Sequence, residues 1–350
     1  MSTILVPFLV AAAVSALATP IAARLAHQLG IIDRPNDRKV NLRDNIPLLG
    51  GLAVGMGFFV SCAVVIIRAG DPSVYTGRIE GFLVGGALLM AVGAFDDRYT
   101  LSWRPKLAVQ LTAAWVAIYY GFRIEHFTEP FGLTQWNFHP AVMLVVTTGW
   151  IIFITNAMNL LDGLDGLATG VGAIVGATLT YVCWDANQVF GYTVGLALVG
   201  ALLGFLPFNF SPAKIFLGDT GALLTGFSLS LLALEGYAKA TLLTFVVPIL
   251  ALAVPLIDTG LSIVRRALSG RPIFDPDKQH IHHRMLASSG THRDAVLSIY
   301  FLTACFCVIA VSFTHLSGAA AILFLGLVVI LTVRLLRNLG FLSTEDPEGD

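Results

Sequence analysis

Long apolar runs, separated by short polar segments, extend along this chain from residue 4 to residue 337. Runs of this length predict helices that span a lipid bilayer, because one span needs about 20 mostly apolar residues. We therefore expect an all-α polytopic membrane helical bundle with about eleven transmembrane helices. These helices lie near residues 4–26, 48–68, 81–96, 105–121, 140–159, 166–184, 190–208, 220–235, 240–263, 296–314 and 318–337.

The distribution of Lys and Arg predicts the orientation of the bundle. Most of the 21 Lys and Arg residues fall in one alternate set of loops and helix ends. The other set holds Arg68, Arg78, Arg123 and Lys239. Because positive residues favour the cytoplasmic side, we expect the N-terminus outside and the C-terminus in the cytoplasm. Residues 1–342 would form a single integral membrane domain with cytoplasmic loops at 27–47, 97–105, 209–219 and 264–295, followed by a disordered acidic tail at 343–350.

Composition agrees with a membrane protein and argues against a nucleic-acid partner. Hydrophobic residues make up 56% of the chain and charged residues 12%, with a mean hydropathy of +0.79. The formal net charge of -1 provides no basic field for nucleic acid. The four cysteines show no zinc-site spacing, and we interpret them as small buried hydrophobes.

Acidic residues recur at those ends of the predicted helices that share the cytoplasmic side. Asp96 and Asp97 close one helix at its C-terminus, where the helix dipole disfavours carboxylates. Carboxylates beside a hydrocarbon phase are costly and tend to be functional. We therefore favour a metal- or substrate-facing pair over a solvated loop pair, with Lys106 close enough in sequence to bind an anion at the same site.

A second polar stripe follows the helix at 140–159. Asn156, Asn159, Asp162 and Asp165 recur at steps of three, which projects them to nearly one face of a helix or tight turn. A helix cap could account for one of these acids. The complete stripe requires a partner such as a metal ion or a polar substrate.

Two further segments carry candidate chemistry. The segment from Asn209 to Gly221 contains Asp219, which could cap the next helix and also bind a ligand there. The longest basic loop contains the run His280-Ile281-His282-His283-Arg284. Its spacing is not typical of zinc sites, whereas an adjacent Arg suits phosphate. A solvated loop cluster is the alternative interpretation of this run.

Taken in order and spacing, four motifs resemble the polyprenyl-phosphate N-acetylhexosamine-1-phosphate transferases of glycosyltransferase family 4. The motifs are Asp96-Asp97, Asn156 to Ala168, Phe216 to Gly221 and His280 to Arg284. The resemblance runs from about Asp33 to Arg293. The form of the histidine run is similar to the bacterial branch that uses UDP-N-acetylglucosamine, whereas the muramoyl-pentapeptide branch normally carries a different His-rich motif.

The resemblance implies transfer of N-acetylglucosamine 1-phosphate from UDP-N-acetylglucosamine to undecaprenyl phosphate, with release of UMP. It implies a site at the cytoplasmic face of the plasma membrane and a first step toward a cell-surface glycan such as lipopolysaccharide or teichoic acid. It implies Mg²⁺, with Mn²⁺ as the alternative, held by Asn159 and Asp219. Catalytic roles are implied for Asp96, Asp97, Asp162 and Asp165. Substrate-binding roles are implied for Lys106, Asn156, Asn209, His280, His282, His283 and Arg284.

Several alternatives stay open from sequence. The donor could be another UDP-N-acetylhexosamine or the muramoyl-pentapeptide nucleotide, and a homodimer is one alternative for the oligomeric state in the lipid membrane. We favour direct attack by the lipid phosphate over an aspartyl-phosphate intermediate. A secondary transporter should carry its site near the bilayer midplane in repeated halves, and an intramembrane aspartyl protease should carry paired aspartates inside its helices. We see neither pattern.

Overall fold

A computed structural model describes residues 4–33, 45–69, 77–128, 135–235, 242–268, 270, 281, 285–286, 291–316 and 318–338. Its helices are α1 (Val6–Leu29), α2 (Gly50–Arg68), α3 (Arg78–Tyr99), α4 (Trp103–Tyr119), α5 (Pro140–Leu161), α6 (Leu167–Asp185), α7 (Val189–Asn209), α8 (Gly218–Glu235), α9 (Leu242–Ala251), α10 (Ala253–Leu268), α12 (His292–Thr314) and α13 (Gly318–Asn338). Two short antiparallel hairpins join some of them. One pairs β1 (Ile32–Asp33) with β2 (Ile46–Pro47), and the other pairs β3 (His126–Thr128) with β4 (Gln135–Asn137).

Most helices lie within a few residues of the predicted apolar runs, but the single helix expected at 240–263 is wrong. There the chain forms α9 and α10, which meet at Leu252. Pro255 explains the break, because it has no N–H to donate to the carbonyl of Ala251 and its ring crowds that carbonyl. The freed carbonyl of Ala251 accepts a weak hydrogen bond from Cys307 Sγ of α12 at 3.8 Å.

The protein is a multi-pass membrane protein. Within the described part of the chain, α1, α2, α3, α5, α6, α7 and α12 are long and apolar enough to cross a membrane. Large apolar side chains point outward from several of these helices. Leu17 is 73% exposed and Val145 is 70% exposed, as suits side chains that face lipid rather than water. The total of eleven spans and their orientation stay predictions.

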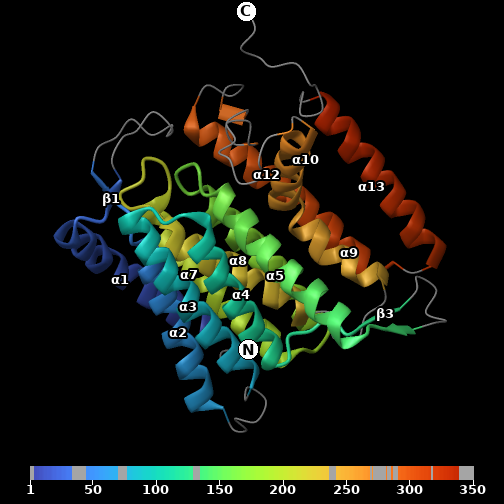
Figure 1. Ribbon diagram of the computed structural model, residues 1–350, viewed down its shortest axis with the longest axis horizontal. Coiled ribbons are helices and arrows are strands. Elements are labelled where there is room, and N and C mark those ends of the chain that lie inside the picture. The colour runs from blue at the N-terminus through green and yellow to red at the C-terminus, as the bar shows by residue number, and fades with distance from the viewer. Residues whose placement is uncertain are drawn as a thin grey trace, which may run out of the picture.

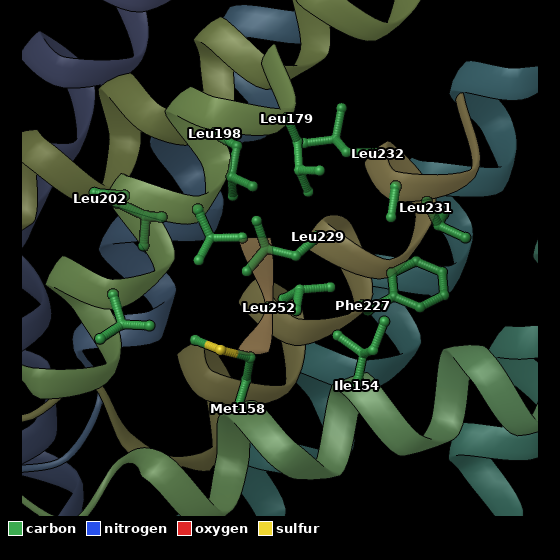
Figure 2. Close-up of a cluster of buried hydrophobic side chains, with 14 of the residues drawn as sticks. Ile154, Met158, Leu179, Leu198, Leu202, Phe227, Leu229, Leu231, Leu232 and Leu252 are labelled. Carbon is green, nitrogen blue, oxygen red and sulfur yellow. The ribbon is translucent and has the colours of Figure 1, made fainter. Parts of the chain in front are cut away.

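The core of the bundle surrounds α8. Figure 1 shows α8 and α5 in the middle of the molecule, with α1, α2 and α7 on one side and α9, α10, α12 and α13 on the other. Almost every residue of α8 is buried, so this helix packs on all sides against α2, α3, α5 and α6. Figure 2 shows this packing, in which side chains of α8 meet those of other elements; the labelled residues are Ile154, Met158, Leu179, Leu198, Leu202, Phe227, Leu229, Leu231, Leu232 and Leu252.

Small residues let two helices approach the beginning of α8 very closely. A Cβ atom added at Gly93 of α3 would lie 2.5 Å from the Cα atom of Thr220, and one added at Gly51 of α2 would lie 2.5 Å from the Cα atom of Gly221. At the other end of the pair, Arg78 Nη1 of α3 contacts Glu235 Oε2 of α8 at 2.8 Å. The antiparallel α3–α8 pair is therefore held at both of its ends.

Candidate active site

Asp97, the last acid of α3, holds the first turn of α8. Its Oδ1 accepts a hydrogen bond from Asp219 N at 2.8 Å, and its Oδ2 accepts from Thr220 N at 3.1 Å and from Thr220 Oγ1 at 2.7 Å. These donors belong to a helix N-terminus, which has unpaired N–H groups and a positive dipole end. Asp97 thus caps α8 from a neighbouring helix and thereby orients Asp219.

Glycine is required at the position before Asp219. Gly218 has a φ of +70°, a left-handed conformation that other residues adopt only with strain. A Cβ atom there would also lie 2.7 Å from Asp97 Oδ2, which would displace the capping carboxylate. The Gly218-Asp219 pair therefore needs both a special backbone angle and space for Asp97.

Backbone hydrogen bonds fix the residues that lead into α8. Phe216 N donates to the Pro47 carbonyl at 2.8 Å, and Gly50 N and Gly51 N donate to the carbonyls of Phe216 and Leu217 at 2.9 and 2.8 Å. The carbonyls of Phe216 and Leu217 thereby satisfy free N–H groups at the beginning of α2. The loop before Asp219 is held by α2 as well as by α3.

Lys106 of α4 joins two carboxylates of this cluster. Its Nζ lies 2.9 Å from Asp96 Oδ2 and 3.1 Å from Asp219 Oδ2. Asp96 Oδ1 also accepts from Leu101 N at 2.6 Å. Asn159 of α5 makes a side-chain hydrogen bond to Asp219. The side chains of Lys106 and Asp219 are 24% and 25% exposed, so an outside ligand can reach this junction of four helices.

Asp162 follows the end of α5 and adds a further negative group. The backbone of Gly218 donates to its carboxylate. Burial, followed by the negative charges of Asp219, Asp97 and Asp165, raises the pKa of Asp162 well above its usual range. Acids held together against their mutual repulsion are typical of functional sites, and a bound cation would relieve this repulsion.

Asp165 and Asn209 order the loop between α7 and α8. Asp165 Oδ2 accepts from Ala213 N at 3.0 Å. Asn209 Nδ2 donates to the Ile215 carbonyl at 3.1 Å, and its Oδ1 accepts from Thr169 Oγ1 at 2.6 Å. Both side chains are buried among protein partners. Their predicted roles in catalysis and substrate binding stay predictions.

Asn156 faces α4 rather than the carboxylates. Its side-chain amide pairs with that of Gln110, a residue that the sequence analysis did not single out. The signal in the sequence was weak: Gln110 is one polar residue in an apolar run, placed four residues after Lys106. The partner of such a residue depends on how two helices are rotated, and spacing along one helix does not reveal that rotation.

The predicted donor-binding residues His280, His282, His283 and Arg284 lie outside the described residues. Their neighbour Ile281 is described: its side chain is 4% exposed, and its backbone N donates to Asp258 Oδ1 of α10 at 2.7 Å. Asp258 therefore anchors the chain in the middle of the histidine run.

The oxygen-rich cluster fits a magnesium site in which substrate phosphates supply some of the ligands. In the described part of the chain, no group of three or more His, Cys, Asp or Glu side chains forms a ready-made metal site. Mg²⁺, however, is usually bound by one or two protein oxygens together with waters and substrate phosphates. The Asp219 carboxylate and the Asn159 side-chain oxygen are ligands of that kind.

The expectation that these acids converge is confirmed. Asp96 and Asp97 lie at the end of α3, Asp162 follows α5, and Asp219 begins α8; Asp219 interacts with each of the other three. The helices run in alternating directions, so these termini meet at one end of the bundle. Three segments far apart in the sequence thus form one polar site.

Comparison with known proteins assigns the chain to a family. A profile described as glycosyl transferase family 4 matches residues 79–237, which include the whole acidic cluster. A probable undecaprenyl-phosphate N-acetylglucosaminyl 1-phosphate transferase of Bacillus subtilis (strain 168) is 39% identical, over 89% of this chain and 85% of the relative. A decaprenyl-phosphate N-acetylglucosaminephosphotransferase of Mycobacterium tuberculosis (strain ATCC 25618 / H37Rv) is 35% identical over 83% and 78%, respectively. The undecaprenyl-phosphate alpha-N-acetylglucosaminyl 1-phosphate transferase of Escherichia coli (strain K12) is 28% identical over 79% and 75%. The extent and level of this similarity show that the chain belongs to glycosyl transferase family 4.

Proposed function

We propose that this protein transfers N-acetylglucosamine 1-phosphate from UDP-N-acetylglucosamine to undecaprenyl phosphate and releases UMP. The relatives named for this reaction support the proposal, since they align over most of the chain. The observation that carries it is the convergence of Lys106, Asn159 and Asp219 beside the Asp97 cap. Donors with another N-acetylhexosamine or with muramoyl-pentapeptide are the alternatives within the same chemistry.

The proposed reaction forms one phosphorus–oxygen bond and breaks another. An oxygen of the lipid phosphate attacks the β-phosphorus of the donor, and the bond from that phosphorus to the bridging oxygen breaks. UMP leaves with the bridging oxygen, and the bond between the sugar and its phosphate stays intact. A phosphate monoester has a second pKa of about 6, so the acceptor is largely ionised near neutral pH and needs no strong base.

Asp219 and Asn159 would hold the Mg²⁺, or Mn²⁺, that the family implies. A divalent ion supplies charge neutralisation for the phosphates that the reaction brings together. Lys106 would contribute a second positive charge. Its ammonium group has three N–H donors, and it would donate to a substrate phosphate once a cation binds one of the two carboxylates that it contacts. Asp162 lies beside the same junction, where a bound cation would favour the charged form of its carboxyl group.

We propose that this site faces the cytoplasm in the plasma (inner) membrane. The nucleotide donor is water-soluble, and the phosphate of the lipid acceptor lies at the membrane surface, so both must meet at that boundary. The bias of Lys and Arg supports this side. The same bias supports a single membrane domain at 1–342, eleven spans, an outer N-terminus and a cytoplasmic C-terminus. Membrane lipids surround the protein, and a homodimer is left open.

Purified protein in detergent tests the function directly. We expect UMP release only when UDP-N-acetylglucosamine, undecaprenyl phosphate and Mg²⁺ are all present. A panel of UDP-sugars under the same conditions identifies the preferred donor. UMP release that does not need the lipid, or none with any donor, would contradict the proposal and would leave the transporter alternative to be tested by uptake into vesicles.

The same preparation distinguishes direct attack from a covalent intermediate. Donor labelled in its sugar phosphate is incubated with the enzyme and Mg²⁺ without the lipid, and the protein is then denatured. We expect no label on the protein, because we favour attack by the lipid phosphate itself. Label retained on a denatured aspartate would show the two-step route instead.

A further inference from the structure

The side-chain amides of Gln110 in α4 and Asn156 in α5 form a reciprocal pair. Gln110 Nε2 donates to Asn156 Oδ1 at 3.2 Å, and Asn156 Nδ2 donates to Gln110 Oε1 at 2.8 Å. The second proton of Asn156 Nδ2 goes to the Ile152 carbonyl at 2.8 Å. Gln110 is only 4% exposed. Both donors of Asn156 are therefore used within the protein, which makes the pair a joint between two helices.

This joint lies next to the two residues that reach Asp219. Gln110 stands one helical turn from Lys106, and Asn156 stands three residues from Asn159, so each amide shares a helix face with one of them. Lys106 Nζ lies 3.1 Å from Asp219 Oδ2, and Asn159 bonds to the same carboxylate. The contacts close a circuit through three helices: Lys106, Gln110, Asn156, Asn159 and Asp219.

A closed circuit restrains a side chain that is otherwise flexible. Lys has four rotatable bonds, and its ammonium group can adopt many positions unless its helix is fixed. The Gln110–Asn156 pair fixes the spacing and rotation of α4 against α5. Among apolar helices, an amide without a partner is costly, so this pairing favours one relative position over its neighbours.

We propose that Gln110 is a positioning residue of the transferase reaction. Through Asn156 it holds α4 so that the Lys106 ammonium stays between Asp96 and Asp219. The proposal rests on the proposed function for its kinetic consequence, but the position of Lys106 can be measured without catalysis.

Chemical labelling of lysine measures that position directly. Wild-type protein and Gln110→Ala are treated with an amine acetylating reagent, and mass spectrometry follows Lys106 relative to the exposed Lys214 in the same molecule. We expect acetylation of Lys106 to become several-fold faster in Gln110→Ala, because its ammonium spends less time paired with carboxylates. Thr112→Val on the exposed face of α4 is the matched control and should match wild type.

Steady-state kinetics measure the consequence for turnover. We expect kcat of Gln110→Ala to fall roughly 10- to 100-fold, the range typical of residues that orient a ligand-bearing group from behind. The KM values for donor and lipid should change little, because Gln110 does not touch either substrate. Exchanging the pair, Gln110→Asn with Asn156→Gln, should restore most of kcat because it rebuilds the amide joint.

An apolar double variant separates positioning from folding. Gln110→Met with Asn156→Leu removes both amides together, which should keep the protein folded and leave no unpaired polar group. We expect kcat to stay low in this variant although its Tm matches wild type. Wild-type kcat in the double variant, or an unchanged kcat or unchanged Lys106 labelling in Gln110→Ala, would overturn the proposal. Absence of UMP release from wild type would count against the proposed function alone, since labelling still tests the joint.

Discussion

The Asp97 carboxylate of α3 binds Thr220 of α8 twice, through its backbone N at 3.1 Å and its hydroxyl at 2.7 Å. With the bond to Asp219 N, these contacts make Asp97 the cap of the helix that presents Asp219. Two adjacent aspartates therefore do different things: Asp97 supports the site from behind, whereas Asp96 contacts Lys106 at its surface.

Removing the charge of Asp97 should weaken both the fold and the activity. Asp97→Asn loses one acceptor oxygen and the favourable charge at a helix N-terminus, which costs about 0.5–2 kcal/mol of stability. We expect a lower Tm in detergent together with a marked loss of UMP release. Asp185→Asn, at the exposed end of α6, is the control acid and should leave both unchanged. Lost activity at an unchanged Tm would instead indicate direct contact with substrate.

Asp219→Asn should nearly abolish turnover in a protein that remains folded. The substitution keeps the size of the side chain but removes the charge that faces Lys106 and the expected Mg²⁺. UMP release is measured across a Mg²⁺ titration, and Tm reports the fold. Wild-type turnover with an unchanged Mg²⁺ requirement would remove Asp219 from the metal site.

Gly218→Ala should be strongly destabilising. Alanine at a φ of +70° is strained, and its Cβ would press on Asp97 Oδ2, so we expect a loss of roughly 2 kcal/mol or more. Gly149→Ala in α5 is a matched control, because a Cβ there meets no atom within 4 Å. Helix propensity favours alanine at that position. Thermal unfolding in detergent compares the two, and equal Tm values would contradict the geometry at Gly218.

Asp258→Ala should mainly impair use of the nucleotide donor. The carboxylate of Asp258 holds Ile281 N at 2.7 Å, and the chain neighbours of Ile281 are His280 and His282. We expect KM for the UDP-sugar to rise while KM for the lipid stays near its wild-type value. Asp258→Asn keeps an acceptor oxygen and should be the milder variant. Equal effects on both substrates would show that Asp258 supports the whole fold instead.

The sequence predicted the helices and the meeting point of the acids for a physical reason. Apolar runs must be long to cross a bilayer. Because successive helices alternate in direction, every second loop lies at the same face of the membrane. This logic located Asp96, Asp162 and Asp219 together. It did not foresee the break at Leu252, because a Pro inside an apolar run is also compatible with one continuous, kinked span.

Contacts between helices were less predictable than the helices themselves. Asp96 and Asp97 look alike in sequence, and only the rotation of α3 decides which carboxylate meets Lys106 and which meets the backbone of Thr220. The pairing of Asn156 with Gln110 depends in the same way on α4 and α5. The rotation of each helix about its axis follows from packing at glycines such as Gly93. The hydropathy of the sequence does not predict this rotation.

Enclosure of α8 has a consequence for how the chain enters the membrane. A helix surrounded by other helices contacts protein side chains rather than lipid. It can therefore carry the polar residues Thr225, Ser228 and Ser230, which are buried in the protein. Such a segment gains little by partitioning into a bilayer alone. Its stable insertion during synthesis would depend on α2, α3, α5 and α6, which are made before it and enclose the segment that bears Asp219.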